Sequence, residues 1–138
     1  MPSSEPYVIR LAGPWDYEFA GRTGRAALDA DWLQLLGPDA QGEIVLIRRF
    51  GRPTNLEADE HVWLTLQGWN VPRAILELNG VLRTQMIAES IDVTPVLQPR
   101  NELRITTAIP PAITPAWGQV SLVIQRGSEP PSKISQKS

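Results

Sequence analysis

Short apolar runs in which every second residue is hydrophobic recur along the chain. Residues 61–67, 73–79, 101–108 and 119–125 follow this rule, as Val120, Leu122 and Ile124 illustrate. A period of two places one face of a strand on a core and the other in water. Thirteen prolines and ten glycines separate the runs, which is typical of a domain built from many short strands. The pattern predicts an all-β fold.

The same reading predicts further strands and their connections. Segments 7–11, 15–19, 43–50 and 81–87 complete a set of about eight strands. Asn79-Gly80 lies between two of them and predicts a hairpin, because both residues tolerate positive φ. Residues 26–36 predict a short helix with Trp32 and Leu36 on one face. Thr94-Pro95 predicts a one-turn helix with Thr94 as the N-cap.

The length of 138 residues predicts one domain with a core of its own. We expect that domain to span residues 1–126. The last twelve positions, 127–138, are polar and predict a flexible tail. The glycine-containing segment 21–25 carries two arginines but lacks the remaining features of a phosphate-binding loop, and we expect a mobile loop there.

Charge and cysteine content exclude several classes of function. Thirteen basic and fifteen acidic residues give a net charge of −2, so neither nucleic acid nor an anionic membrane surface is an expected partner. No apolar run approaches the length of a membrane span. There is no cysteine for a disulfide or a thiolate metal site. The first residues do not resemble a signal peptide, so we expect a cytoplasmic location. No motif implies a cofactor.

Several of these segments, in this order, resemble the N-terminal sugar-binding domain of glycoside hydrolase family 2, which includes β-galactosidases, β-glucuronidases and β-mannosidases. Residues 13–19 resemble its G-x-W-x-F strand, and residues 48–50 its R-x-F strand. The pair of segments at 62–68 and 74–80 is similar to L-x-F-x-G followed by A-x-V-x-L-N-G. Residues 91–97 and 101–103 resemble F-D-V-T-x-x-L and N-x-L, and residues 118–124 the closing strand. The resemblance implies an antiparallel β-sandwich of the jelly-roll, galactose-binding-like type.

The resemblance does not imply hydrolysis. The family's catalytic glutamates belong to a barrel domain that has no counterpart in these residues, and the loops 84–90 and 109–117 are shorter than those of the family. Asn101-Glu102 matches the dipeptide of a catalytic glutamate, but it lies in a sandwich strand, where we expect Glu102 to face solvent. His61 follows three acidic residues, and we interpret that segment as a solvated turn, not a metal site. We therefore expect no enzyme activity.

The five tryptophans offer the candidate binding residues. We expect Trp15 and Trp32 in the core, and Trp63 on the opposite side of its sheet, because it is out of phase with its apolar neighbours. Trp69 with Asn70, and Trp117 with Gln119, pair an aromatic ring with an amide, as sugar sites do. The alternative is that these rings pack within the protein or form a protein–protein patch.

Two functions remain open at this point. The first is a non-catalytic binding module with carbohydrate as its ligand class, bound through Trp69, Asn70, Trp117 and Gln119. The second is a structural or interaction module, a dimer or the partner of a glycosidase, that has lost sugar binding. The shortened loops favour the second, and the aromatic–amide pairs favour the first.

Overall fold

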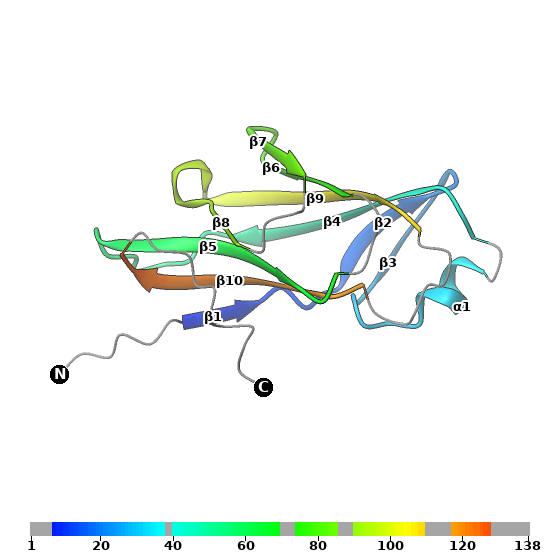
Figure 1. Ribbon diagram of the computed structural model, residues 1–138, viewed down its shortest axis with the longest axis horizontal. Coiled ribbons are helices and arrows are strands. Elements are labelled where there is room, and N and C mark those ends of the chain that lie inside the picture. Colours follow the sequence, from blue (N-terminus) through cyan, green and yellow to red (C-terminus); the bar gives the residue numbers. More distant parts are fainter. Residues whose placement is uncertain (1–6, 38–39, 70–73, 86–89, 110–116, 128–138) are drawn as a thin grey trace.

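Two antiparallel sheets face each other in the structure, a computed structural model that describes residues 7–37, 40–69, 74–85, 90–109 and 117–127 (Figure 1). The four-stranded sheet has the order β1 (Tyr7–Arg10), β10 (Gln119–Arg126), β5 (Glu60–Gln67) and β8 (Ser90–Asp92). The six-stranded sheet has the order β3 (Arg22–Ala26), β2 (Trp15–Phe19), β4 (Glu43–Gly51), β9 (Arg100–Ala108), β6 (Ala74–Leu78) and β7 (Leu82–Gln85). Two short helices, α1 (Trp32–Leu36) and η1 (Thr94–Val96), lie in the connections. The predicted β-sandwich is confirmed.

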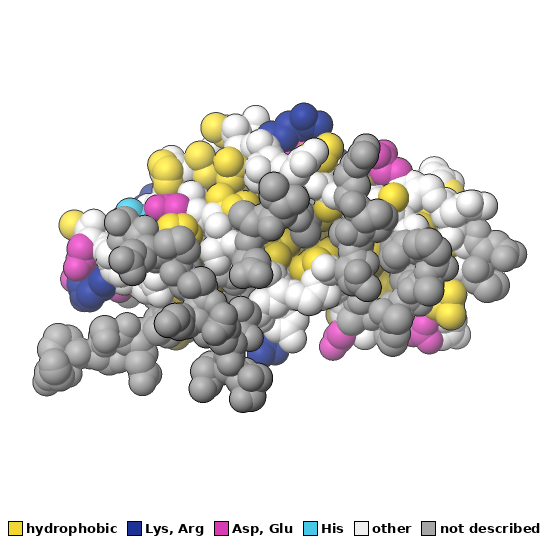
Figure 2. Space-filling model, in the orientation of Figure 1, with side chains coloured by type: hydrophobic (Ala, Val, Ile, Leu, Met, Phe, Trp, Pro, Cys, Tyr) yellow, Lys and Arg dark blue, Asp and Glu magenta, His cyan; other side chains and the backbone are white. Residues whose placement is uncertain are grey.

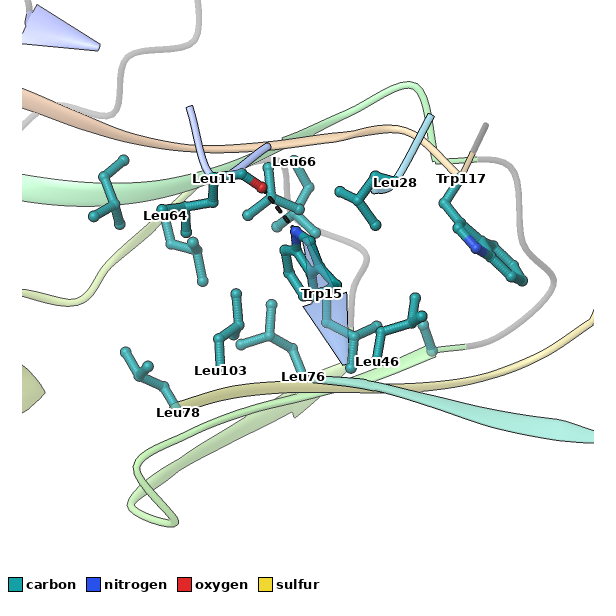
Figure 3. Packing of buried hydrophobic residues seen from close by; sticks show 14 of the residues in the cluster. Leu11, Trp15, Leu28, Leu46, Leu64, Leu66, Leu76, Leu78, Leu103 and Trp117 are labelled. Carbon is teal, nitrogen blue, oxygen red and sulfur yellow. Dashed lines mark hydrogen bonds between the residues drawn. The ribbon is translucent and has the colours of Figure 1, made fainter. Parts of the chain in front are cut away.

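The core lies between the sheets, where alternate residues of each strand meet (Figure 3). Leu64 and Leu122 of one sheet face Leu76 and Leu103 of the other, and all four are almost fully buried. Trp15 and Trp32 are also fully buried, as predicted. Because every strand contributes one face to this core, the period-two pattern in the sequence indicates which face of each sheet is buried.

The Asn79-Gly80 hairpin is confirmed, with φ of 58° at Asn79 and 69° at Gly80. The side chain of Asn79 also forms three hydrogen bonds outside the turn. The Asn79 amide donates to the Val96 carbonyl at 3.0 Å and to Asn101 Oδ1 at 2.9 Å, and its oxygen accepts from the Glu102 amide at 2.8 Å. Asn101, which is 2% exposed, is bonded in turn to both backbone groups of Gln98. The two asparagines therefore join the hairpin to β9 and to the segment after η1.

The structure corrects the mobile loop expected at 21–25. Residues 22–25 belong to β3, which pairs with β2 through a tight turn in which Ala20 and Gly21 have φ of 53° and 76°. Gly24 is needed there, because a Cβ at that position would lie 2.5 Å from the Tyr17 hydroxyl. With β3 and β8 the described residues hold ten strands instead of about eight. Both additional strands lie at sheet edges, where one row of backbone hydrogen bonds suffices and an apolar alternation is not required.

The one-turn helix predicted at Thr94-Pro95 is present as η1, but Thr94 is not its N-cap. The cap residue is Val93, with no side-chain cap hydrogen bond. The Thr94 hydroxyl instead donates to Asp92 and accepts from the Val62 amide at 2.8 Å. The helix predicted within 26–36 is also present, shortened to the five residues of α1. The tail expected at 127–138 lies almost wholly outside the described residues.

The outer faces of the two sheets differ in chemistry. Trp63 does point away from the core, as predicted, and is paired across the sheet with Val123. On the six-stranded sheet the outer face is charged: Asp16 binds Arg25 and Arg49, and Glu102 binds Arg49 and Arg104. Within the described ranges no helix is long and apolar enough to cross a membrane.

Candidate functional site

Trp69 and Trp117 meet where β5 ends and β10 begins. Gln67 and Gln119 are opposite each other in the β5–β10 ladder, so the residues just beyond them are brought together. The two indole rings stack with their centroids 6.2 Å apart and an interplanar angle of 23°. Trp69 Nε1 donates to the Gln119 carbonyl at 3.1 Å. Three of the four predicted site residues thus form one cluster, and the fourth, Asn70, lies outside the described residues.

Gly118 makes this stacking possible. Its φ of 147° is one that residues with side chains rarely adopt, and a Cβ there would lie 2.6 Å from Trp69 Cδ1 and 2.7 Å from the Gln67 carbonyl oxygen. Trp69 therefore lies directly over the backbone of residue 118. Only glycine lets the ring approach so closely.

The two rings differ in what they can offer to a ligand. Trp117 is 3% exposed and is enclosed between Trp69 and Trp32, whose ring lies edge-on at 5.8 Å. Trp32 continues the series to Tyr17 at 5.2 Å. Trp117 therefore packs within the protein, as the alternative to a sugar site predicts. Trp69 is half-buried, so this ring is the one that can serve as a platform for a ligand.

A small cavity adjoins the cluster. It has a volume of about 190 Å³ and is lined by three segments, residues 10–13, 27–29 and 118–120. Gly118 and Gln119 belong both to this lining and to the Trp69 contact. The volume is below the roughly 300 Å³ at which pockets for drug-sized ligands begin, so the cavity suits a small ligand.

The two buried tryptophans, Trp15 and Trp32, donate hydrogen bonds to backbone carbonyls in the cavity lining. Trp15 Nε1 donates to the Leu11 carbonyl at 2.8 Å (Figure 3), and Trp32 Nε1 donates to the carbonyls of Ala27 and Leu28, both at 3.1 Å. The two loops also touch, because a Cβ at Gly13 would lie 3.0 Å from Ala27 Cα. Loops fixed to a rigid core in this way are suited to positioning polar groups for a ligand.

Three polar residues line the cavity: Arg10, Asp29 and Gln119. Within the described part of the chain, none of the three forms an ion pair or a side-chain hydrogen bond. They supply several donors from the guanidinium, acceptors from the carboxylate, and both from the amide. Sequence reasoning identified Gln119 but missed Arg10 and Asp29. Arg10 ends β1 and Asp29 lies in the connection between β3 and α1, so only the folded chain brings them together.

A second polar cluster, around His61, is of a different kind. His61 Nδ1 is 2.7 Å from Asp92 Oδ2, and Thr94 donates to Asp92 Oδ1 from its hydroxyl at 2.7 Å and its amide at 3.0 Å. Partial burial acts to raise the pKa of Asp92, but the hydrogen bonds from Thr94 and His61 outweigh it and hold the pKa below its usual value. The cluster ties β8 and η1 to β5.

Two of the acidic residues that precede His61 form ion pairs with an arginine. Arg126 contacts Asp59 at 2.6 Å and Glu57 at 3.6 Å, and its hydrogen bond to Asp59 lowers the pKa of that carboxyl. Figure 2 shows acidic and basic side chains close together near the histidine, at one end of the molecule. Among the described residues, no three His, Cys, Asp or Glu side chains are grouped so as to hold a metal ion.

The charged outer face of the six-stranded sheet has two open depressions, of about 420 and 570 Å³. Arg49 borders both, beside Asp16 and Glu102. Because these charges are already bound to one another, their hydrogen-bonding capacity is partly used within the protein. The small cavity with three free polar side chains is the better candidate.

No protein-family model and no curated protein sequence matches the chain. Solved structures do. The fold is similar to part of the β-glucuronidase of Bifidobacterium dentium complexed with coumarin-3-O-glucuronide, with a TM-score of 0.70, 16% identity, and coverage of 93% of this chain and 31% of that one. It is also similar to part of the β-D-glucuronidase of Dictyoglomus thermophilum, with a TM-score of 0.68, 13% identity, and coverage of 91% and 29%. For the β-glucuronidase of Ruminococcus gnavus the TM-score is 0.69, the identity 12%, and the coverage 91% and 29%.

The resemblance drawn from the sequence motifs is therefore confirmed at the level of the fold, since β-glucuronidases are among the family 2 enzymes. The chain spans between 23% and 32% of the length of the β-glucuronidases to which its fold is similar. At identities of 12–17% the similarity shows the fold alone. It does not transfer activity or substrate.

Proposed function

We propose that the domain is a non-catalytic carbohydrate-binding module whose ligand, a single sugar ring, enters the cavity between Arg10, Asp29 and Gln119. The observation that carries the proposal is three unpaired polar side chains around a small cavity next to a half-buried indole. Sugars present hydroxyl groups that both donate and accept, together with apolar C–H faces. The free side chains match the hydroxyls, and Trp69 matches the apolar face.

The non-catalytic part of the proposal is supported by the surroundings of the carboxylates. Glycoside hydrolysis requires two carboxyl groups on opposite sides of the scissile bond, one of them kept protonated. Glu102, which the sequence marked as a candidate, contacts Arg49 at 3.4 Å and Arg104 at 3.2 Å on an open sheet face. An ion-paired carboxylate on an open sheet face does not supply the enclosed pair of carboxyl groups that hydrolysis requires.

Calorimetric titration of the folded protein with methyl galactosides, glucuronides and mannosides tests the proposal. We expect one of the three classes to bind, and Gln119→Ala or Asp29→Asn to weaken that binding about fivefold, because each loses a hydrogen bond worth about 1 kcal/mol. Gln85→Ala is the matched control, since this exposed glutamine lies on β7, outside the cavity lining. Absence of heat with all three classes at millimolar concentration overturns the proposal.

One observation favours the alternative, a structural or interaction module that has lost sugar binding. Trp117, one of the two rings that suggested a sugar site, is enclosed by Trp32 and Trp69. This alternative expects no response to any sugar class, and binding to another protein or to a second copy instead. The titration above therefore separates the two functions.

A further inference from the structure

The free edge of β1 is the least protected of the four sheet edges. The other edge strands carry features that discourage pairing: β3 has two arginines and a glycine, β8 has only three residues, and Arg83 on β7 is bound to Glu77. Strand β1 has the sequence Tyr-Val-Ile-Arg, and its side chains at positions 7 and 8 are 66% and 42% exposed. An exposed apolar edge strand is a site for adding another strand.

The backbone of β1 shows which groups are available. Leu11 continues the register of β1 on β10, and its amide donates to the Val120 carbonyl at 2.9 Å. In an antiparallel ladder the direction of the peptide groups alternates, so Tyr7 and Ile9 also face β10, whereas Val8 and Arg10 face outward. Among the described residues no strand lies on that side of β1. The outward amides and carbonyls of Val8 and Arg10 are thus open to a partner.

We propose that this edge binds β1 of a second copy of the chain, antiparallel, about a two-fold axis perpendicular to the sheet. The axis passes beside Ile9, so each Val8 amide donates to the carbonyl of Arg10 in the second copy, and each Arg10 amide donates to the carbonyl of Val8. The pairing joins the two four-stranded sheets into one continuous sheet. It shares Arg10 with the proposed sugar site, through the backbone of that residue, and does not depend on sugar binding.

The second copy is favoured as the occupant because the strand is complementary to itself in this register. Every outward donor meets an outward acceptor, the two Ile9 side chains meet as a close non-hydrogen-bonded pair, and no two like charges are opposite. A symmetric contact of this kind needs no other sequence. The pairing involves only four residues per copy, so the dimer is weak and its population rises with protein concentration.

Val8→Pro tests the hydrogen bonds directly. Because the Val8 amide faces away from β10, proline at this position removes a bond of the dimer and leaves the β1–β10 ladder intact. Because the proposed dimer is two-fold symmetric, the substitution removes this hydrogen bond twice. We therefore expect sedimentation velocity across a concentration series to show a dimer of twice 15.3 kDa for the native chain. For Val8→Pro we expect the dissociation constant of the dimer to rise about tenfold or more.

A second pair of variants separates the edge from general surface hydrophobicity. Val8→Lys places a charge on the edge, and Val81→Lys is the control, because Val81 is 66% exposed but lies in the β6–β7 hairpin. We expect the first to abolish the dimer and the second to leave it unchanged. Hydrogen exchange of the Val8 and Arg10 amides should slow as the concentration of native protein rises.

Three results overturn the proposal: a native chain that is monomeric at every concentration, a dimer that persists in Val8→Pro, or a dimer whose Val8 amide still exchanges at the monomer rate. The last result would place the contact elsewhere. Pairing with an added strand-forming peptide but not with a second copy would also overturn it. Circular dichroism of each variant establishes that the sandwich remains folded.

Discussion

Replacing Gly118 with alanine tests whether Trp69 lies on the backbone as described. The added Cβ would meet Trp69 Cδ1 at 2.6 Å and the Gln67 carbonyl oxygen at 2.7 Å. Overpacking of this kind costs about 2 kcal/mol, and a side chain at φ of 147° adds about 1 kcal/mol of backbone strain. We expect Gly118→Ala to lower the free energy of unfolding by about 3 kcal/mol.

Gly68→Ala is the matched control, one residue from the same ring. Its φ of 74° is also strained for alanine, but a Cβ there would have no atom within 4 Å. We expect a loss of about 1 kcal/mol, from strain alone. Urea unfolding followed by tryptophan fluorescence, with an unchanged dependence on denaturant, measures both variants. Equal losses in the two variants would refute the placement of Trp69 over residue 118.

Three further predictions concern the framework around the site. Asn101→Ala should lower the free energy of unfolding by about 2–3 kcal/mol in urea denaturation, because it removes several part-buried hydrogen bonds at once, and a cycle with Asn79→Gly should show the two losses to be less than additive. Hydrogen bonds hold the pKa of Asp92 below 3.8, so the contribution of its carboxylate to stability is complete above that pH and is lost as the pH falls through the lowered value. Asp92→Asn should therefore reduce the fall in melting temperature between pH 5 and pH 3. An identical fall in both proteins would contradict this. Trp15→Phe should cost about 1–2 kcal/mol more than Trp117→Phe in thermal or urea unfolding, because the Trp15 indole donates a hydrogen bond and the Trp117 indole nitrogen is buried without a partner; equal costs would contradict the assignment.

The strands of the core could be predicted from the sequence because burial acts on alternate residues. Leu64 and Leu76 are almost fully buried, and each belongs to a period-two run whose apolar face was visible in the sequence. The Asn79-Gly80 turn could be predicted because its residue types match the backbone it requires. Trp63 was predicted to face outward from its phase alone, and the register with Val123 confirms this.

Strand β3 could not be predicted in the same way. Its polar residues at an edge bury little surface, so Arg22–Ala26 has no apolar alternation. Its pairing depends instead on the turn at Ala20 and Gly21 and on the fit of the Tyr17 ring over Gly24. These are tertiary contacts, which a single sequence does not display.

The candidate site was predicted only in part, for a related reason. Trp69 and Trp117 were recognised as aromatic residues near strand ends, but their meeting depends on the pairing of Gln67 with Gln119. That pairing decides which ring is enclosed and which is half-buried. Arg10 and Asp29 had no sequence signal, because a cavity formed by three separate segments of the chain exists only after the sheets have assembled.

The indole N–H signals in a nitrogen-15 correlation spectrum test the central claim most directly. The chain has five tryptophans, so five signals are expected, and titration with methyl glycosides should shift that of Trp69 and leave those of Trp15 and Trp32, which are bonded to buried carbonyls, in place. The backbone amide of Gln119 should move with Trp69. A folded protein in which neither signal moves at millimolar concentrations of the three sugar classes would contradict the account.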